Sequence, residues 1–380
     1  MAEKRAKPVV RIGLIGAGFM GKCHANAFRS VAGLFDLPVE PELYLLADID
    51  EAAARRAADA LGFPRSTGDW RQLAGDPEVD IVAITAPNAL HAEMAFAAFE
   101  AGKAVYCEKP LSVDTPSARA MRDAATAAEA CTLVGFAYLK NPMVKLAREI
   151  VASGEIGEAT SFRGIHAEDY MADPASPHSF RTDPAGGGAL FDLGSHVVSL
   201  ARYLLGPIVS VNGATATIHS SRPDAGDPGA MRPVEVDDRA VFLAEFESGI
   251  TGTIEANWTA AGRKMQLAFE VAGTRGSIAF TQERMNELLL YPADGARGRR
   301  GFTRIEAGPD HPPYGRLCPA PGHQLGYNEL KVIEVAELLD AYAGDPPAHP
   351  DFAEGYEVQR TVDAVLVSAR ERRWVDVASV

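Results

Sequence analysis

A glycine motif between a strand-like and a helix-like segment constrains most strongly what this chain can fold into. Gly16, Gly18 and Gly21 are spaced as GxGxxG, directly after the apolar run Val9–Ile15 and at the start of the helix-like segment Gly21–Val31. In that context the first glycine permits a tight turn, the second lets a pyrophosphate approach the backbone, and the third lets the helix pack on the strand. The motif predicts a parallel α/β domain that binds a dinucleotide.

Strand-like and helix-like segments alternate through the first 140 residues. The further strand-like runs are Leu43–Ala47, Ile81–Thr85, Ala104–Cys107 and Thr132–Gly135. The helix-like segments after the first are Glu51–Leu61, His91–Ala101 and Pro116–Ala130. Nearly continuous apolar strands between helices indicate a doubly wound parallel sheet, the Rossmann arrangement.

The pattern changes near residue 140, and a chain of 380 residues commonly forms two domains. After a helix at Pro142–Ser153, alternating strands are predicted, with one helix at Ala189–Leu205 among them. Those strands are Thr160–Ala167, Ala240–Phe246, Gly249–Trp258 and Gln266–Ala272. We therefore predict a Rossmann domain over residues 1–140 and an α+β domain with a mainly antiparallel sheet over 141–380. The Pro- and Gly-rich segments Arg222–Pro233 and Pro292–Pro321 are expected to be long loops.

Asp48 closes the second strand-like run and favours NAD over NADP. A carboxylate at this strand end can accept hydrogen bonds from the ribose hydroxyls and repel a 2′-phosphate. The spacing from the glycines exceeds the usual roughly 20 residues, because Gly33–Glu42 resembles an inserted loop. Asp50 is the competing candidate, although it also fits the N-cap of the next helix.

Charge and cysteine content exclude several classes of protein. Lys and Arg total 37 against 51 Asp and Glu, for a net charge of -14, which argues against nucleic-acid or anionic-membrane partners. The four cysteines form no CxxC pair, so neither a structural zinc nor another metal is expected, and a zinc-dependent alcohol dehydrogenase is disfavoured. No apolar run long enough for a signal peptide follows the basic N-terminal residues before Gly16, so none is expected, and no run reaches the roughly 18 to 20 apolar residues of a membrane span. A reduced, cytoplasmic protein is the expectation.

Two further stretches carry residues suited to chemistry. Lys109 ends a parallel strand at the edge where ligands bind in open α/β sheets, and Pro110 restricts its backbone. A solvated lysine at a strand end is the equally weighted alternative. Asp192 and His196 follow three glycines and, within a helix, would share one face at i and i+4. A carboxylate beside an imidazole suits a general base, whereas a lone histidine is more often part of a core.

In combination these motifs resemble the glucose–fructose oxidoreductase / inositol dehydrogenase (Gfo/Idh/MocA) family. The resemblance rests on GxGxxG, on a Thr-Ala-Pro-Asn-Ala-Leu-His segment, on Glu-Lys-Pro, and on Gly-Gly-Gly-x-Leu-x-Asp-x-Gly-x-His. It implies a large open-faced sheet that commonly serves oligomerisation, and we expect a homo-oligomer, either a dimer or a tetramer. The residues implied at the cofactor are Gly16, Gly18, Phe19, Met20, Gly21, Asp48, Thr85, Asn88, His91, Glu108 and Lys109. The chain departs from the family pattern at Ala137, where this family frequently has Asn.

The resemblance implies that Lys109, Asp192 and His196 form the catalytic group. His196 would be the base for a carbinol proton and Lys109 would stabilise the alkoxide, with NAD taking the hydride. Two loop segments are similar to the subgroup that acts on inositols and free sugars such as L-glucose, and Arg181 and His323 are the expected further substrate contacts. The substrate is therefore expected to be a sugar or an inositol, its isomer unspecified. The alternatives are an NAD-binding sensor without turnover and a reductase of a different carbonyl or an imine.

Overall fold

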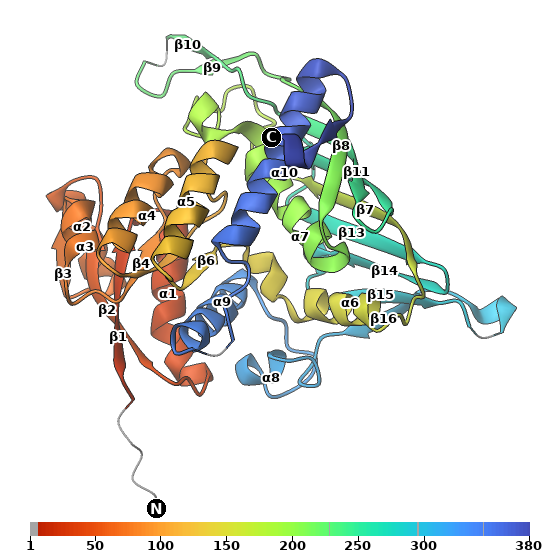
Figure 1. Ribbon diagram of the computed structural model, residues 1–380, viewed down its shortest axis with the longest axis horizontal. Helices are drawn as coiled ribbons and strands as arrows, with labels where there is room; N and C mark the ends of the chain where they lie inside the picture. The colour runs from red at the N-terminus through yellow and green to blue at the C-terminus, as the bar shows by residue number, and fades with distance from the viewer. Residues whose placement is uncertain (1–6, 228, 295, 345) are drawn as a thin grey trace, which may run out of the picture. The chain divides into compact units, whose positions relative to one another are not determined.

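The computed structural model describes residues 7–227, 229–294, 296–344 and 346–380 (Figure 1). Its contacts divide the chain into two compact units. The first comprises the chain up to Ser112 with Pro116–Ala137 and Gly326–Tyr356, and the second comprises Val113–Thr115, Tyr138–Leu325 and Glu357–Val380. The sequence pattern places residues 326–356 in the second domain, whereas these contacts group them with the first unit. Residues 1–6, on which the signal-peptide prediction depends, lie outside the described residues, as do residues 228 and 295 of the two predicted loops.

The first unit contains a six-stranded parallel sheet, as the alternation predicts. Its order is β3 (Arg65–Thr67), β2 (Glu40–Ala47), β1 (Val9–Ile15), β4 (Ile81–Ile84), β5 (Ala104–Cys107) and β6 (Thr132–Val134). Every residue of β4 and β5 is buried, because helices cover both faces of the sheet. The strand order reverses between β1 and β4, and ligands of open α/β sheets bind beyond the carboxyl ends at such a point.

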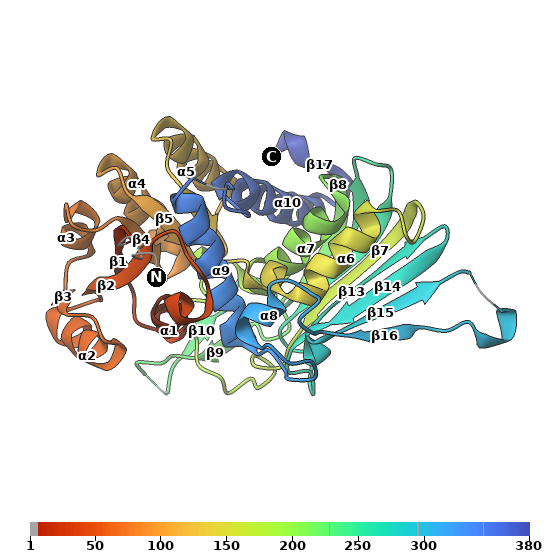
Figure 2. The same cartoon turned by 90° about the horizontal axis from the view of Figure 1, so that it is seen from below.

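The helices of the first unit lie on the two faces of its sheet (Figure 2). One face carries α1 (Phe19–Leu34), α2 (Glu51–Leu61) and α9 (Tyr327–Tyr342); the other carries α3 (Trp70–Gly75), α4 (His91–Glu100) and α5 (Thr115–Ala127). The predicted inserted loop Gly33–Glu42 is shorter than expected, because α1 continues to Leu34 and β2 begins at Glu40. The short elements β3 and α3 are absent from the prediction.

The second unit is built on a nine-stranded sheet. Its order is β16 (Thr303–Glu306), β15 (Glu287–Pro292), β14 (Gly276–Thr281), β13 (Gln266–Gly273), β7 (Ala159–Ala167), β12 (Thr251–Asn257), β11 (Arg239–Phe246), β8 (Ile208–Ala216) and β17 (Val375–Asp376). Neighbouring strands run antiparallel except β7 and β12, which are parallel. This confirms the predicted, mainly antiparallel sheet.

One face of this sheet is covered by α6 (Pro142–Ala152), α7 (Ser195–Leu205) and α10 (Phe352–Glu371), and the other is bare (Figure 2). Along β11 exposed and buried residues alternate strictly, because successive strand side chains point to opposite faces. Val241 and Leu243 point to the bare face and are 37% and 45% exposed.

The two predicted long loops contain regular structure. Residues 222–233 include the strand β10 (Met231–Pro233), which pairs with β9 (Ser221–Pro223). Residues 292–321 include β16 and the short helix α8 (Tyr314–Leu317). Each of these elements is only three or four residues long, which is too short to show a strand or helix pattern in segments rich in Pro and Gly.

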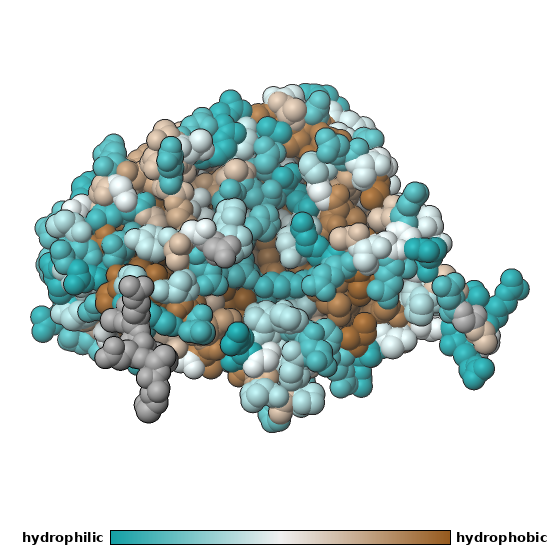
Figure 3. Space-filling model, turned by 60° about the horizontal axis from the view of Figure 1, so that its bottom comes forward, coloured by the Kyte–Doolittle hydropathy of each residue, from teal (hydrophilic) through white to brown (hydrophobic). Residues whose placement is uncertain are grey.

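Apolar and polar side chains are interspersed over the surface shown in Figure 3, where the apolar patches are separated by hydrophilic residues. Within the part of the chain that the structure describes, no helix has both the length and the apolar character needed to cross a bilayer.

Candidate active site

The glycine motif has the geometry that a dinucleotide pyrophosphate requires. Gly16 has φ +91°, and a Cβ at Gly21 would lie 2.2 Å from the Gly16 carbonyl oxygen. Neither position therefore accepts a side chain without displacement of the backbone. A Cβ at Gly18, by contrast, would meet nothing within 4 Å, and no side chain caps the start of α1 there. The first turn of α1 is thus open to an anion, and the residues present fit the cofactor.

Asp48 lies half-buried at the carboxyl end of β2, with both carboxylate oxygens held by the backbone. Oδ2 accepts a hydrogen bond from the amide of Ala17 at 3.0 Å, and Oδ1 accepts from the amide of Ile49 at 2.7 Å. Asp50 caps α2, accepting from the amide of Ala53 at 2.7 Å. Asp50 therefore serves as the N-cap of a helix, whereas Asp48 is the carboxylate next to the glycine loop.

Thr85 and His91, both predicted at the cofactor, engage the backbone around the site. The Thr85 hydroxyl lies 2.7 Å from the carbonyl oxygen of Gly16 and so ties β4 to the glycine loop. His91 is fully buried, with its ring nitrogens 2.9 Å and 3.0 Å from the carbonyl oxygens of Ala86 and Pro110. Burial lowers the pKa of His91, which favours its neutral form. A buried ring in this position is better placed to orient these two loops than to contact a ligand directly. Asn88 begins the short 3₁₀ turn that precedes α4.

Phe19 and Met20 meet an aromatic residue of α9. The Phe19 ring is 71% exposed and stacks on Tyr327 with centroids 6.1 Å apart. The Tyr327 hydroxyl lies 3.4 Å from the sulfur of Met20. Tyr327 is therefore a neighbour of the dinucleotide motif that the sequence pattern does not predict, because more than 300 residues of sequence separate the two segments.

Glu108 and Lys109 follow β5 at the carboxyl edge of the sheet. Lys109 is half-buried, whereas Glu108 is only 5% exposed. Oε1 of Glu108 lies 2.6 Å from the ammonium of Lys331 and 2.7 Å from Nε2 of His24, and Oε2 accepts from the Lys109 amide at 3.2 Å. Burial alone would raise the pKa of Glu108, but the Lys331 charge and the His24 hydrogen bond lower it well below its usual range. Glu108 is thus a fixed, ionised group.

In the second unit Asp192 is held by two donors. Its Oδ2 accepts from the Tyr170 hydroxyl at 2.7 Å and from Nε of Arg181 at 3.0 Å. The predicted contact residue Arg181 therefore meets Asp192 directly. Tyr170, an exposed loop residue, is part of the same arrangement.

The helix that carries Asp192 and His196 begins with a π turn. Residues Leu190–Gly194 form this widened turn, in which the amide of Ser195 donates to the carbonyl of Leu190, and α7 follows from Ser195. Asp192 therefore lies in a π turn, whereas the sequence pattern predicts a regular helix over the whole of Ala189–Leu205. Such π turns are frequent at functional sites.

His196 lies among aromatic side chains and is 8% exposed. Its ring centroid is 4.7 Å from that of Tyr138 and 5.5 Å from that of His166. The His166 ring is fixed in turn, with Nδ1 3.1 Å from the Leu193 carbonyl oxygen and Nε2 2.9 Å from a Glu168 carboxylate oxygen. Titratable and hydroxyl groups therefore surround His196 on the second unit.

Asp237 anchors the start of this helix. Its Oδ2 accepts from the Leu190 amide at 2.9 Å, and its carbonyl accepts from the Ala189 amide at 2.9 Å. A Cβ at Gly188, which has φ +76°, would lie 2.5 Å from the Asp237 carboxylate. Burial raises the pKa of Asp237 to about 7, and adjacent Asp238 adds to the rise, while the Leu190 amide opposes it.

His323 occupies an exposed loop position, and its carbonyl accepts a hydrogen bond from Tyr314. Lys109 belongs to the first unit, and Asp192, His196, Arg181 and His323 belong to the second. No group of three or more His, Cys, Asp or Glu side chains is arranged to hold a metal within the described ranges.

The two units define a dinucleotide-binding oxidoreductase, and comparison with known proteins agrees. Residues 10–136 match the model of an oxidoreductase family with an NAD-binding Rossmann fold, and residues 144–279 match the GFO/IDH/MocA C-terminal domain. The chain belongs to the Gfo/Idh/MocA family and is an NAD-binding oxidoreductase.

Several relatives are similar along nearly the whole chain. Levoglucosan dehydrogenase of Pseudarthrobacter phenanthrenivorans is 40% identical over 98% of this chain and 99% of its own. Inositol 2-dehydrogenase of Rhizobium meliloti is 29% identical over 97% of this chain and 99% of its own. Among solved structures, levoglucosan dehydrogenase in complex with NADH and levoglucosan has a TM-score of 0.94 at 40% identity, covering 97% of this chain and 99% of that one. An NAD-binding oxidoreductase from Klebsiella pneumoniae has a TM-score of 0.92 at 44% identity, covering 97% and 98%.

Proposed function

We propose that this protein is an NAD-dependent dehydrogenase that oxidises a secondary hydroxyl of a cyclic sugar or polyol to the ketone or lactone. The names of its relatives, which include levoglucosan and inositol dehydrogenases, support this substrate class. Levoglucosan is the first candidate, since the 40% identical relative is named for it, followed by myo-inositol, scyllo-inositol and L-glucose.

The observation that carries the proposal is the fixed carboxylate of Asp192. Because Tyr170 and Arg181 both donate to Oδ2, the carboxylate is held at one orientation. An oriented carboxylate on the same helix as a buried imidazole is suited to positioning a substrate hydroxyl and stabilising a protonated ring. A sensor without turnover would not need this arrangement.

In the proposed mechanism His196 takes the hydroxyl proton of the substrate at a ring nitrogen. Asp192 orients the substrate or the ring, and the Lys109 ammonium stabilises the negative charge that develops on the carbinol oxygen. NAD supplies the hydride acceptor when bound. Glu108, fixed by Lys331 and His24, holds the Lys109 backbone through its amide. Arg181 and His323 are proposed substrate contacts, and Asp48 is proposed to select NAD.

The test is a screen of NAD+ reduction with levoglucosan, myo-inositol, scyllo-inositol, L-glucose and D-glucose, repeated with NADP+. We expect turnover of at least one cyclic polyol with NAD+ and a much lower rate with NADP+. NAD binding without turnover of any substrate in either direction would refute the proposed enzyme in favour of a sensor.

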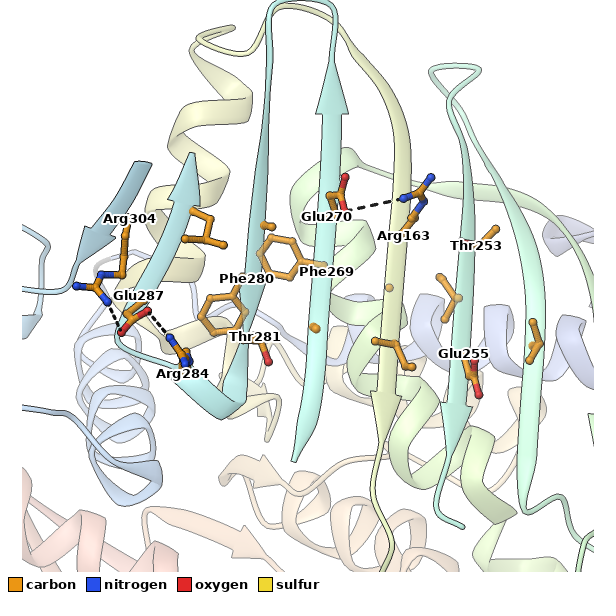
Figure 4. A pocket seen from close by; sticks show the side chains of 17 residues that line it. Arg163, Thr253, Glu255, Phe269, Glu270, Phe280, Thr281, Arg284, Glu287 and Arg304 are labelled. Carbon is orange, nitrogen blue, oxygen red and sulfur yellow. Dashed lines mark ion pairs between the residues drawn. The ribbon is translucent and has the colours of Figure 1, made fainter. Parts of the chain in front are cut away.

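We also propose that the bare face of the nine-stranded sheet forms a homo-oligomer interface, in a dimer or a tetramer. A hollow of about 730 Å³ lies on this face (Figure 4), and apolar side chains such as Val241 and Leu289 line it. The hollow is bordered by ion pairs of Arg163 with Glu270 at 4.0 Å and of Arg304 with Glu287 at 3.8 Å. A broad face with exposed apolar residues is typical of protein–protein contact. Light scattering after chromatography tests this proposal. Leu243→Glu is expected to shift the measured mass toward that of the monomer, and a monomeric wild type would refute the interface.

The four free cysteines support a reducing, cytoplasmic location.

A further inference from the structure

A buried charge cluster lies in the first unit between β5, α1 and α9. The ammonium of Lys331 is 2.6 Å from Oε1 of Glu108 and 2.7 Å from Oε2 of Glu334. The Tyr106 hydroxyl also donates to Glu334, and His24 contacts Glu108 at 2.7 Å. Lys331 is 1% exposed and Glu334 is 0% exposed, so these charges are shielded from water.

The cluster holds more negative than positive charge. Burial lowers the pKa of His24 and raises that of Tyr106, which favours the neutral form of both. Burial would lower the pKa of Lys331, but the two carboxylates raise it well above its usual value, so the ammonium is retained. One ammonium therefore faces two carboxylates, Glu108 and Glu334, and one negative charge is left uncompensated.

Stability alone does not explain the second carboxylate. Lys331 already pairs with Glu108, and Oε1 of Glu334 is buried without a hydrogen-bond partner in the described residues. A buried carboxylate oxygen without a partner is costly, and an uncharged side chain of the same size would avoid most of that cost. The surplus charge therefore calls for a functional explanation.

The position of the cluster suggests what the charge acts on. Glu108 lies at the carboxyl edge of the parallel sheet, where a dinucleotide binds, and its Oε2 accepts from the Lys109 amide. The nicotinamide ring is cationic in NAD+ and neutral in NADH. The Lys109 ammonium would therefore repel the oxidised form and weaken the binding of NAD+ relative to NADH. We propose that the surplus negative charge of the Glu108–Lys331–Glu334 cluster offsets Lys109 and raises the affinity for NAD+ relative to NADH. This inference rests on the proposed function: because Lys109 would act at the carbinol that gives its hydride to NAD, the nicotinamide end of NAD would lie beside Lys109 and Glu108.

The test is the ratio of the NAD+ and NADH dissociation constants, measured by calorimetry and by NADH fluorescence without substrate. Glu334→Gln keeps an oxygen acceptor for Lys331 and Tyr106 but brings the cluster to neutrality. We expect the ratio Kd(NAD+)/Kd(NADH) to rise roughly 3- to 10-fold, from one charge acting through a partly screened interior. Glu337→Gln removes the same charge from a less buried position of α9 and should leave the ratio within about twofold of wild type. Should Glu334→Gln accumulate poorly, Glu334→Met makes the same change of charge.

A charge-restoring variant separates this effect from a merely structural one. Lys331→Met combined with Glu334→Gln leaves Glu108 as the one charge of the cluster, so the net charge returns to that of the wild type. The ratio should return toward the wild-type value at pH 8, even though more interactions are lost than in the single variant. An unchanged ratio in Glu334→Gln, or a larger departure in the double variant, would overturn the proposal. A wild-type protein that binds neither dinucleotide would instead refute the cofactor site itself.

Discussion

Replacing Asp237 with asparagine is expected to remove a pH-dependent loss of stability from the second unit. Burial raises the pKa of this carboxyl from 3.8 to about 7. Below pH 3.8 it is protonated in the folded and the unfolded chain alike and contributes nothing. Between pH 3.8 and 7 the unfolded chain releases the proton while the folded chain keeps it, so stability falls as pH rises. The full loss is about 4 kcal/mol, reached above pH 7, because a tenfold difference in proton affinity between the two states corresponds to about 1.4 kcal/mol.

The assay is urea unfolding of the wild type and of Asp237→Asn at pH 5 and pH 8. From pH 5 to pH 8 the free energy of unfolding of Asp237→Asn should increase relative to wild type by about 2.5 kcal/mol. The asparagine oxygen can still accept the Leu190 amide, so the helix anchor is retained. Asp310→Asn, in an exposed loop, is the control and should show no such change. A difference between wild type and Asp237→Asn that is constant across this pH range would refute the reasoning.

Three further substitutions test the site. Asp48→Ser should raise kcat/KM with NADP+ relative to NAD+ by roughly 10- to 100-fold, because it removes the carboxylate that would repel a 2′-phosphate; an unchanged ratio would exclude Asp48 as the selecting group. In Gly135→Ala the new Cβ would lie 2.8 Å from the Glu108 carboxylate, so weaker NAD binding in calorimetry is expected, and wild-type affinity would contradict it. Tyr170→Phe removes one donor to Asp192 and should lower kcat by about 10-fold with a small effect on the dissociation constant of NAD; full activity would show that the hydrogen bond is dispensable.

The dinucleotide half was largely predictable because its signals are local. Gly16 and Gly21 are fixed by backbone geometry that no other residue meets. The strands β4 and β5 are continuous, buried apolar runs, and β1 is mostly apolar, with Arg11 as its one charged residue. The antiparallel sheet of the second unit was predictable for a similar reason, since alternation with period two marks strands. Its bare face was expected only from the resemblance to the Gfo/Idh/MocA family. Short elements such as β3 and α3 were not predicted, because three to six residues are too few to show a strand or helix periodicity.

Contacts between distant segments could not be predicted in this way. Lys331 meets Glu108 across 223 residues, and its sequence surroundings are those of any helix surface. Tyr170 belongs to a loop whose composition indicates only solvent exposure, although it donates to Asp192. The π turn before α7 has no recognisable signal in the local sequence either, because the three glycines that precede it are compatible with an ordinary helix start.

The proposed mechanism requires Lys109 and His196 to serve the same transition state, and a double-mutant cycle on kcat tests this requirement. Lys109→Ala and His196→Ala should each reduce kcat for the best polyol by at least about 1000-fold, to a residual rate that remains measurable, with unfolding transitions like that of the wild type. The double variant should be scarcely slower than the worse single variant, because groups that serve one transition state are strongly non-additive. A wild-type rate in either single variant, or two effects that multiply in full, would show that the two groups do not serve one transition state.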